Sequence, residues 1–337
     1  MTIRVLLIFL VLRVAVFGQV ISSIPEASLQ LTPFYLSSQQ RDVKLKLSSP
    51  AAIAIAASGN IYVFDDGNSR IVKLNPNGSF MAEFGQPGTG AGAVNRADLN
   101  DSIAVDKDEN VYVTDPVTPR VLIFNSAGTF VRSFRSPFPM TSIAVNSQRE
   151  VFLATATPRQ PELIYVFSDH GKFLRKFGER LVKGHGSLAR AVNHAYITCD
   201  ARDNLYVAFR SWPEIRKYSP AGVLVTQGQF HVPSQLVKDS QRASFSLDFF
   251  ARYPDSSFMP PLITHSITVD RRGRGYLLLN AHSIVVFSSN CQIIKQFHFN
   301  PPRVGYNTFL RLATGPNSKQ VYLIDTRSGE IYRTETL

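Results

Sequence analysis

Long apolar runs and cysteines are both scarce in this chain of 337 residues. The main apolar run near the N-terminus, Val5 to Leu12, has eight residues before Arg13. A membrane-spanning helix needs about 20, so this run is too short to cross a bilayer. Two cysteines allow one disulfide at most. The sequence also contains no Gly-x-Ser-x-Gly, which excludes a nucleophile elbow.

Acidic residues are outnumbered by basic ones, 25 to 36, which gives a formal net charge of +11. Without Arg4 and Arg13 the net charge is +9. Such a surface attracts nucleic acid, anionic envelope polymers or acidic proteins; a soluble surface without an anionic partner is the alternative. Charged residues make up 18% and hydrophobic residues 44% of the chain, which excludes the composition of a disordered protein.

The first 18 residues are organised like a secretory signal. Arg4 precedes the apolar run, and Val16 and Gly18 stand where a signal peptidase cuts. We therefore expect a signal peptide over residues 1–18 and a secreted or periplasmic protein, for which nucleic acid is the least accessible partner. A plain N-terminal strand is the alternative. Because no cysteine lies near the cut, we expect no lipid anchor there.

One pattern recurs six times: a small apolar triplet, a polar turn and an aromatic strand. The clearest copy is Ile53-Ala54-Ile55 followed by Ile61-Tyr62-Val63. The triplets begin at residues 53, 103, 143, 197, 267 and 312, close to the roughly 40–50 residues of one four-stranded propeller blade. The sequence therefore predicts an all-β six-bladed β-propeller over residues 49–337, with four antiparallel strands in each blade and no linker.

The last copy is too short for four strands, because only four residues follow Arg333. An open edge costs stability and invites aggregation. We expect residues 19–48 to supply the closing strand, either from Leu29 to Leu36 or from Val43 to Leu47, and the sequence leaves both candidates open.

The repeats also place the two cysteines. Cys199 aligns with the buried inner-strand residues Ile55 and Val105, whereas Cys291 takes the turn position of Gly78 toward the outer rim. These places are separated by several strand spacings of about 4.8 Å, beyond the roughly 7 Å limit of a disulfide. We expect two free thiols, with Cys199 packed as a small apolar residue.

The first copy resembles an NHL repeat in the run from Gly59 to Asp65, in Arg70 and in the closing Phe84-Gly85. Asp115 and Arg120 repeat the Asp–Arg spacing. The resemblance covers nearly all of the chain after the leader, although later copies keep only the pattern. NHL-type proteins are six-bladed propellers, so the resemblance implies the same count. We expect the Asp–Arg pairs to fix a turn through charge-assisted hydrogen bonds.

A second resemblance, to the amidating lyase that cleaves peptidyl-hydroxyglycine, bears on metal binding. In that family each of three zinc-binding histidines precedes a first-strand aliphatic residue by two positions, and the zinc keeps an open coordination position. The matching residues here are Ala51, Asp101, Thr141, Ala195, His265 and Leu310. Only His265 fits the pattern; His194 lies one residue too early, and Asp101 offers a third, oxygen ligand.

Other propeller enzymes use axial glutamates, as in the gluconolactonase-like and strictosidine-synthase-like groups. Here Glu83 and Glu330 fall on predicted outer strands or loops. The longest departure from the repeat, between Val225 and Leu262, is aromatic and basic. It could form a lid or recognition loop, or it could pack its aromatic residues on a blade edge.

We expect a non-catalytic, monomeric scaffold without a cofactor that binds a protein, peptide or glycan near the axis; an anionic ligand would suit the net charge. The residues expected to line this face are Asn100, Asp101, Ser102, Thr141, His194 and His265, joined by Phe250 and Arg252 from the insertion. The alternative is a metal-dependent lyase or hydrolase in which His194, His265 and Asp101 hold zinc or calcium. RNA binding, as in intracellular NHL proteins, requires an uncleaved N-terminus.

Overall fold

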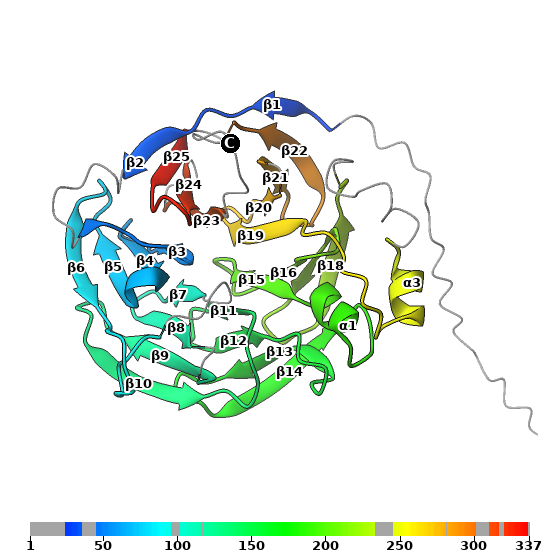
Figure 1. Ribbon diagram of the computed structural model, residues 1–337. Helices are drawn as coiled ribbons and strands as arrows, with labels where there is room; N and C mark the ends of the chain where they lie inside the picture. Colours follow the sequence, from blue (N-terminus) through cyan, green and yellow to red (C-terminus); the bar gives the residue numbers. More distant parts are fainter. Residues whose placement is uncertain are drawn as a thin grey trace, which may run out of the picture.

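The computed structural model describes residues 24–35, 45–95, 102–115, 118–232, 245–280, 282–300, 310–316 and 320–335. The expected signal peptide, Asn100 and Asp101 lie outside these ranges. Six sheets form a ring, as predicted (Figure 1). The helices in the described ranges are short: η3 (Asp66–Asn68), α1 (Ser187–Val192) and α3 (Leu247–Arg252). None of them has the length and apolar character needed to cross a membrane.

In each sheet the strands of the blade run antiparallel, from an inner strand at the axis outward to the rim. The first two sheets contain β3 (Ala52–Ile55), β4 (Ile61–Asp65), β5 (Arg70–Leu74), β6 (Phe80–Phe84), and β7 (Ile103–Val105), β8 (Val111–Asp115), β9 (Arg120–Phe124), β10 (Phe130–Arg135). The next two contain β11 (Ser142–Val145), β12 (Val151–Ala154), β13 (Glu162–Phe167), β14 (Phe173–Glu179), and β15 (Ala195–Cys199), β16 (Leu205–Phe209), β17 (Glu214–Tyr218), β18 (Leu224–Gln229). The last two contain β19 (Thr264–Val269), β20 (Gly275–Leu279), β21 (Ser283–Phe287), β22 (Ile293–His298), and β23 (Leu310–Thr314), β24 (Gln320–Asp325), β25 (Ile331–Glu335).

The strands become more exposed from the middle of each blade to its rim. All five residues of β4 are buried, whereas β10 alternates between half-buried and exposed residues. This follows from the sequence, because a strand covered on both faces needs a continuous apolar run and an edge strand needs only one apolar face. The aromatic residues of the second strands are all buried: Tyr62, Tyr112, Phe152, Tyr206, Tyr276 and Tyr322.

Six apolar clusters hold the ring together, one at each contact between neighbouring sheets. The cluster that joins the sixth sheet to the first contains Tyr322 and Ile324 from β24 together with Ile53 and Val63 from β3 and β4. The ring is therefore closed by apolar burial as well as by strand pairing.

The N-terminal segment contributes two outer strands. β2 (Thr32–Tyr35) lies antiparallel to β25, with Thr32 opposite Arg333. It falls within the first of the two segments considered for closure; of the second, residues 45–47 are described and form no strand. β1 (Glu26–Ser28) lies parallel to β22 and makes the fifth sheet five-stranded, which the repeat pattern did not predict.

The Asp–Arg pairs have the structural role predicted for them. The Arg70 Nε lies 2.8 Å from an Asp65 carboxylate oxygen, and the Arg120 Nε lies 3.0 Å from that of Asp115. Each pair joins the end of a second strand to the start of the third, and both aspartates are buried. Both cysteines are free thiols, as predicted.

Candidate functional site

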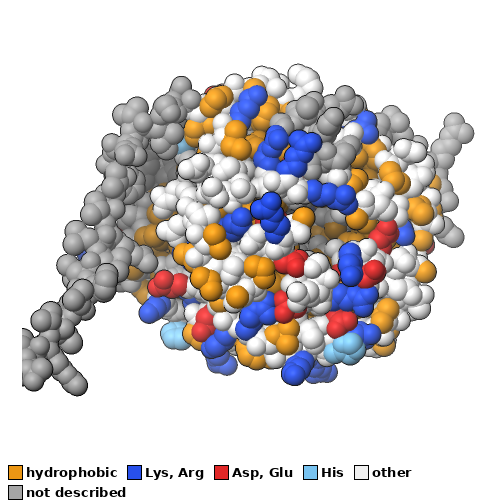
Figure 2. Space-filling model, turned by 180° about the vertical axis from the view of Figure 1, so that it is seen from behind, with side chains coloured by type: hydrophobic (Ala, Val, Ile, Leu, Met, Phe, Trp, Pro, Cys, Tyr) orange, Lys and Arg blue, Asp and Glu red, His pale blue; other side chains and the backbone are white. Residues whose placement is uncertain are grey.

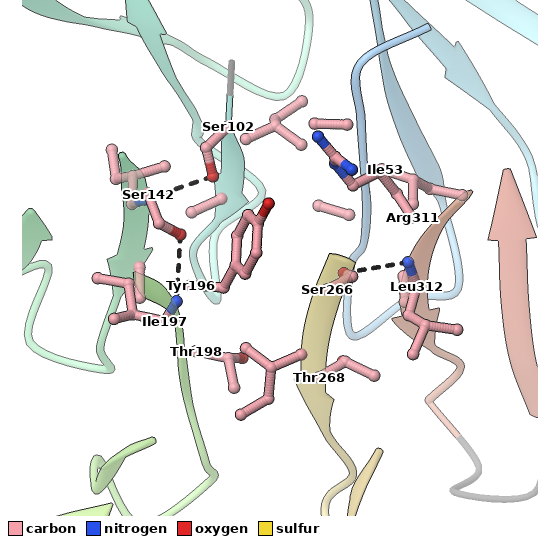
Figure 3. Close-up of a pocket in the computed structure, with 18 of the residues that line it drawn as sticks. Ile53, Ser102, Ser142, Tyr196, Ile197, Thr198, Ser266, Thr268, Arg311 and Leu312 are labelled. Carbon is pink, nitrogen blue, oxygen red and sulfur yellow. Dashed lines mark hydrogen bonds between the residues drawn. The ribbon is translucent and has the colours of Figure 1, made fainter. Parts of the chain in front are cut away.

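A cavity of about 240 Å³ lies on the axis of the ring, between the six inner strands (Figure 3). Side chains two positions apart on a strand point the same way, so the residue before each triplet and the middle residue of the triplet face the axis together. The middle residues are all small: Ala54, Ala104, Ala144, Thr198, Thr268 and Ala313. Their size leaves the axis open.

Serines before the triplets join neighbouring sheets at the start of the inner strands. The Ser142 Oγ accepts a hydrogen bond of 3.2 Å from the backbone N–H of Ile197 in the next sheet. Ser102 and Ser266 accept the corresponding bonds from the sheets that follow them, at 3.3 and 3.2 Å. Figure 3 shows these three bonds around the cavity.

Tyr196 and Arg311 occupy the same position in the fourth and sixth sheets, and they place large side chains where the other sheets have Ser or Ala. Both point into the cavity, from walls that are separated by the fifth sheet (Figure 3). The Arg311 Cζ lies 5.9 Å from the centre of the Tyr196 ring, within the range of a cation–π contact. Among the described residues that line the cavity, Arg311 carries the only charge.

Arg311 is 9% exposed and has few partners. In the described part of the chain its one hydrogen bond is from Nη1 to the His265 carbonyl oxygen, at a long 3.4 Å. A buried charge is costly unless it is paired and hydrogen-bonded. With respect to the described residues, several N–H groups of the guanidinium are therefore available to an anion that enters the cavity.

His194 and His265 lie at the same end of the cavity and are buried. Burial, together with the positive charges of Arg210 and Arg311, lowers the pKa of His194 to about 3. Burial and then Arg311 lower the pKa of His265 to about 4. Both imidazoles are therefore neutral at pH 7, in a region of positive potential.

Four of the predicted site residues lie at this end of the axis. Ser102 and Thr141 line the cavity, and the Thr141 hydroxyl donates a 3.0 Å hydrogen bond to the Ala195 carbonyl oxygen. His194 packs edge-on against Tyr196, with ring centres 5.4 Å apart, and His265 lies beside Arg311 through its carbonyl. Asn100 and Asp101 lie outside the described residues.

The structure does not bring Phe250 and Arg252 to the cavity. Phe250 is fully buried in α3, in an aromatic cluster with Trp212 and Phe245. Arg252 is exposed at the end of the same helix. Of the two interpretations of the insertion, its described aromatic residues match packing on a blade, because they contact the core between the third and fourth sheets.

Sequence reasoning missed Tyr196 and Arg311. The signal was present: the position before the triplet is Ser in three copies and Ala in one, so Tyr and Arg break the pattern.

At the other end of the cavity, none of the described lining residues is charged. The Thr268 and Thr314 hydroxyls lie 3.2 Å apart, and burial raises the pKa of the Cys199 thiol well above its usual range. The face around this end carries exposed arginines in the turn after β19, Arg271 and Arg272. On that face, acidic side chains lie beside basic ones in the lower part of Figure 2, whereas the upper part shows basic ones alone.

No family model matches the chain, and no curated protein has a matching sequence. Several solved structures are similar. A streptogramin B lyase has a TM-score of 0.56 at 12% identity, over 92% of this chain and 98% of that one. Virginiamycin B lyase from Staphylococcus aureus has 0.55 at 13%, over 92% and 100%. The hydrazine synthase of Kuenenia stuttgartiensis has 0.55 at 9%, over 86% and 96%. At these identities the likeness shows the propeller fold alone.

Proposed function

We propose that this chain is an exported binding protein that recognises a protein, peptide or glycan where the inner strands begin, and that it does so without catalysis. The observation that carries this is the pair Tyr196 and Arg311. Each stands at a position where serine joins neighbouring sheets, and each instead points into the cavity. Departures from a local structural rule are expected where a residue serves function.

The scaffold suits recognition because the binding groups are fixed. Arg311 and Tyr196 project from inner strands that are paired and packed on both sides, and groups on rigid elements lose little conformational freedom when a ligand binds. The positive charge near His194 and His265 favours an anionic ligand.

The same charge weakens the case for a metal. A divalent cation beside His194 and His265 would be repelled by Arg210 and Arg311, which already lower the pKa of both histidines. Neutral imidazoles are nevertheless the form of histidine that binds metals. Because some proteins of similar fold are lyases, a metal-dependent lyase or hydrolase is the second candidate function. Metal analysis of the purified protein separates the two: stoichiometric zinc or calcium that is lost in His265→Ala supports the enzyme.

A comparison of two proteins tests the proposed function. The wild type and a Tyr196→Ser/Arg311→Ser double variant, in which every replaced residue becomes the serine of the repeat, are screened against a peptide library, a glycan array and RNA. We expect ligands that only the wild type binds. Ligands bound equally by both proteins would place recognition elsewhere on the molecule.

Export is tested separately by mass spectrometry of the mature N-terminus. A mass that corresponds to cleavage after Gly18 supports a secreted or periplasmic protein. An intact N-terminus would argue against export and would make RNA an accessible partner.

A further inference from the structure

The donors at the axial end match one kind of anion in particular. The Arg311 guanidinium presents N–H groups in a planar fork, a geometry that fits the two oxygens of a carboxylate. Its Cζ lies 5.9 Å from the centre of the Tyr196 ring, and the long bond to the His265 carbonyl occupies only Nη1. A carboxylate that enters the cavity can therefore form two parallel charge-assisted hydrogen bonds.

Side-chain acceptors of the described residues in the same place are limited to hydroxyl oxygens. None of the described residues that line the cavity is Asp, Glu, Asn or Gln. The three serine hydroxyls already accept hydrogen bonds from backbone N–H groups, as at Ser142. An acidic sugar would bring several hydroxyl groups whose donors need acceptors, so this lining suits it poorly.

The cavity is narrow, because the side chains that face its axis at mid-height are small. Ala54, Ala104 and Ala144 face the axis, and the available volume of about 240 Å³ is small. The end of a peptide brings one carboxylate, one amide N–H and one side chain, so it makes few demands on acceptors. A short apolar side chain would fit against the alanines.

We propose that the axial end of the cavity binds the free C-terminal carboxylate of a peptide or protein whose last residue is small and apolar, with Arg311 as the carboxylate-binding residue and Tyr196 as its positioning residue. This inference rests on the proposed function above, because it names the ligand class of the same site.

The test compares a matched pair of probes. Acetyl-Ala-Ala-Ala with a free carboxylate and the same peptide as its C-terminal amide are titrated into the purified full chain by calorimetry at pH 7. We expect the acid to bind about tenfold or more tightly than the amide, since a hydrogen-bonded charge contributes on that order. Glucuronate is a third probe, and we expect it to bind more weakly than the peptide acid.

Three variants test whether Arg311 causes the preference for the acid. Arg311→Gln should bind acid and amide alike, and Arg311→Lys should keep part of the preference, because it retains the charge but loses the fork. Arg272→Gln is the matched control: it removes the same charge from an exposed turn on the opposite face and should leave the preference unchanged. Circular dichroism melting confirms that each variant is folded.

The remaining outcomes overturn the inference in different ways. Equal binding of acid and amide to the wild type would refute the carboxylate site and leave axial recognition standing. Tighter binding of glucuronate would assign the site to acidic sugars. A preference for the acid that persists in Arg311→Gln would show that another residue binds the carboxylate. No binding of either peptide at 10 mM, roughly the weakest affinity such a contact gives, would refute the site. The proposed function is tested separately by its own ligand screen, and it fails there if the ligands bind independently of Tyr196 and Arg311.

Discussion

The two ends of the axial cavity belong to the same six inner strands but differ in chemistry. At the end where the strands begin, Arg311 and Tyr196 face each other across the opening, beside two buried neutral histidines. At the end where the strands finish, the lining consists of hydroxyl, thiol and aliphatic groups, such as Thr314 and Cys199. The fold requires only small side chains at the axis, and the second end keeps to that requirement.

The difference shows which departures from the repeat lower the stability of the fold. A serine before the triplet accepts a backbone N–H from the next sheet, and Arg311 and Tyr196 make no such bond in the described structure. A residue that lacks this hydrogen bond between blades is destabilising by itself. A charge in a buried cavity, such as that of Arg311, adds to the cost. Such residues are expected where a ligand makes use of them.

The largest effect is expected from reversing the charge at the first end. Arg311→Glu should weaken binding of an anionic ligand by about a hundredfold or more, because the partner of a buried charge pair is replaced by a like charge. Calorimetric titration measures the change. A variant that still binds within threefold of the wild type would show that the charge difference between the ends is irrelevant to the ligand.

The histidines make the stability contributed by the first end depend on pH. Their folded pKa values, about 4 for His265 and about 3 for His194, lie below the unfolded value of 6.5. The unfolded state therefore binds protons first, so their contribution is complete above pH 6.5 and is lost as the pH falls toward 4. For His265 the loss is roughly 3 kcal/mol.

Urea unfolding of the wild type and His265→Gln at pH 7 and pH 4 measures this loss. We expect the variant to lose less stability between the two pH values. His170→Gln, at an exposed histidine, is the control and should behave as the wild type. Equal pH dependence in His265→Gln and the wild type would show that His265 is not held neutral by the fold.

Removing a hydrogen bond between blades should have a smaller effect on stability than the protonation of His265. Ser142→Ala removes the acceptor for the Ile197 N–H and should cost about 1 kcal/mol of unfolding free energy, with ligand binding unchanged. Thr268→Val at the other end breaks the contact with Thr314 and should cost a similar amount or less. A loss of binding in Ser142→Ala would mean that the serines and the binding groups do not act separately.

The sequence predicted the repeated part of the molecule because each blade is specified locally. Triplets such as Ile103-Ala104-Val105, followed by a turn and an aromatic strand, show in their own sequence which residues are buried. The Asp65–Arg70 contact at the turn joins residues that are only five positions apart. The pairing of β1 with β22 joins opposite ends of the chain, and three residues of β1 carry no pattern that identifies a partner.

The site was predicted only in part, for a related reason. Ser102, Thr141, His194 and His265 follow from their places in the repeat, so the structure brings them to one end of the axis. Phe250 lies in the insertion, where no repeat fixes the direction of a side chain, and its apolar ring packs in the core instead. The roles proposed for Asn100 and Asp101 remain predictions.

The free energy of unfolding of the Tyr196→Ser/Arg311→Ser double variant, measured by urea titration beside the wild type, tests the central claim most directly. If these two residues serve the ligand and not the fold, the added serines restore the hydrogen bonds between blades, and the variant should be within about 1 kcal/mol of the wild type or above it. A loss of several kcal/mol would contradict the account, because it would make Tyr196 and Arg311 part of what holds the ring together.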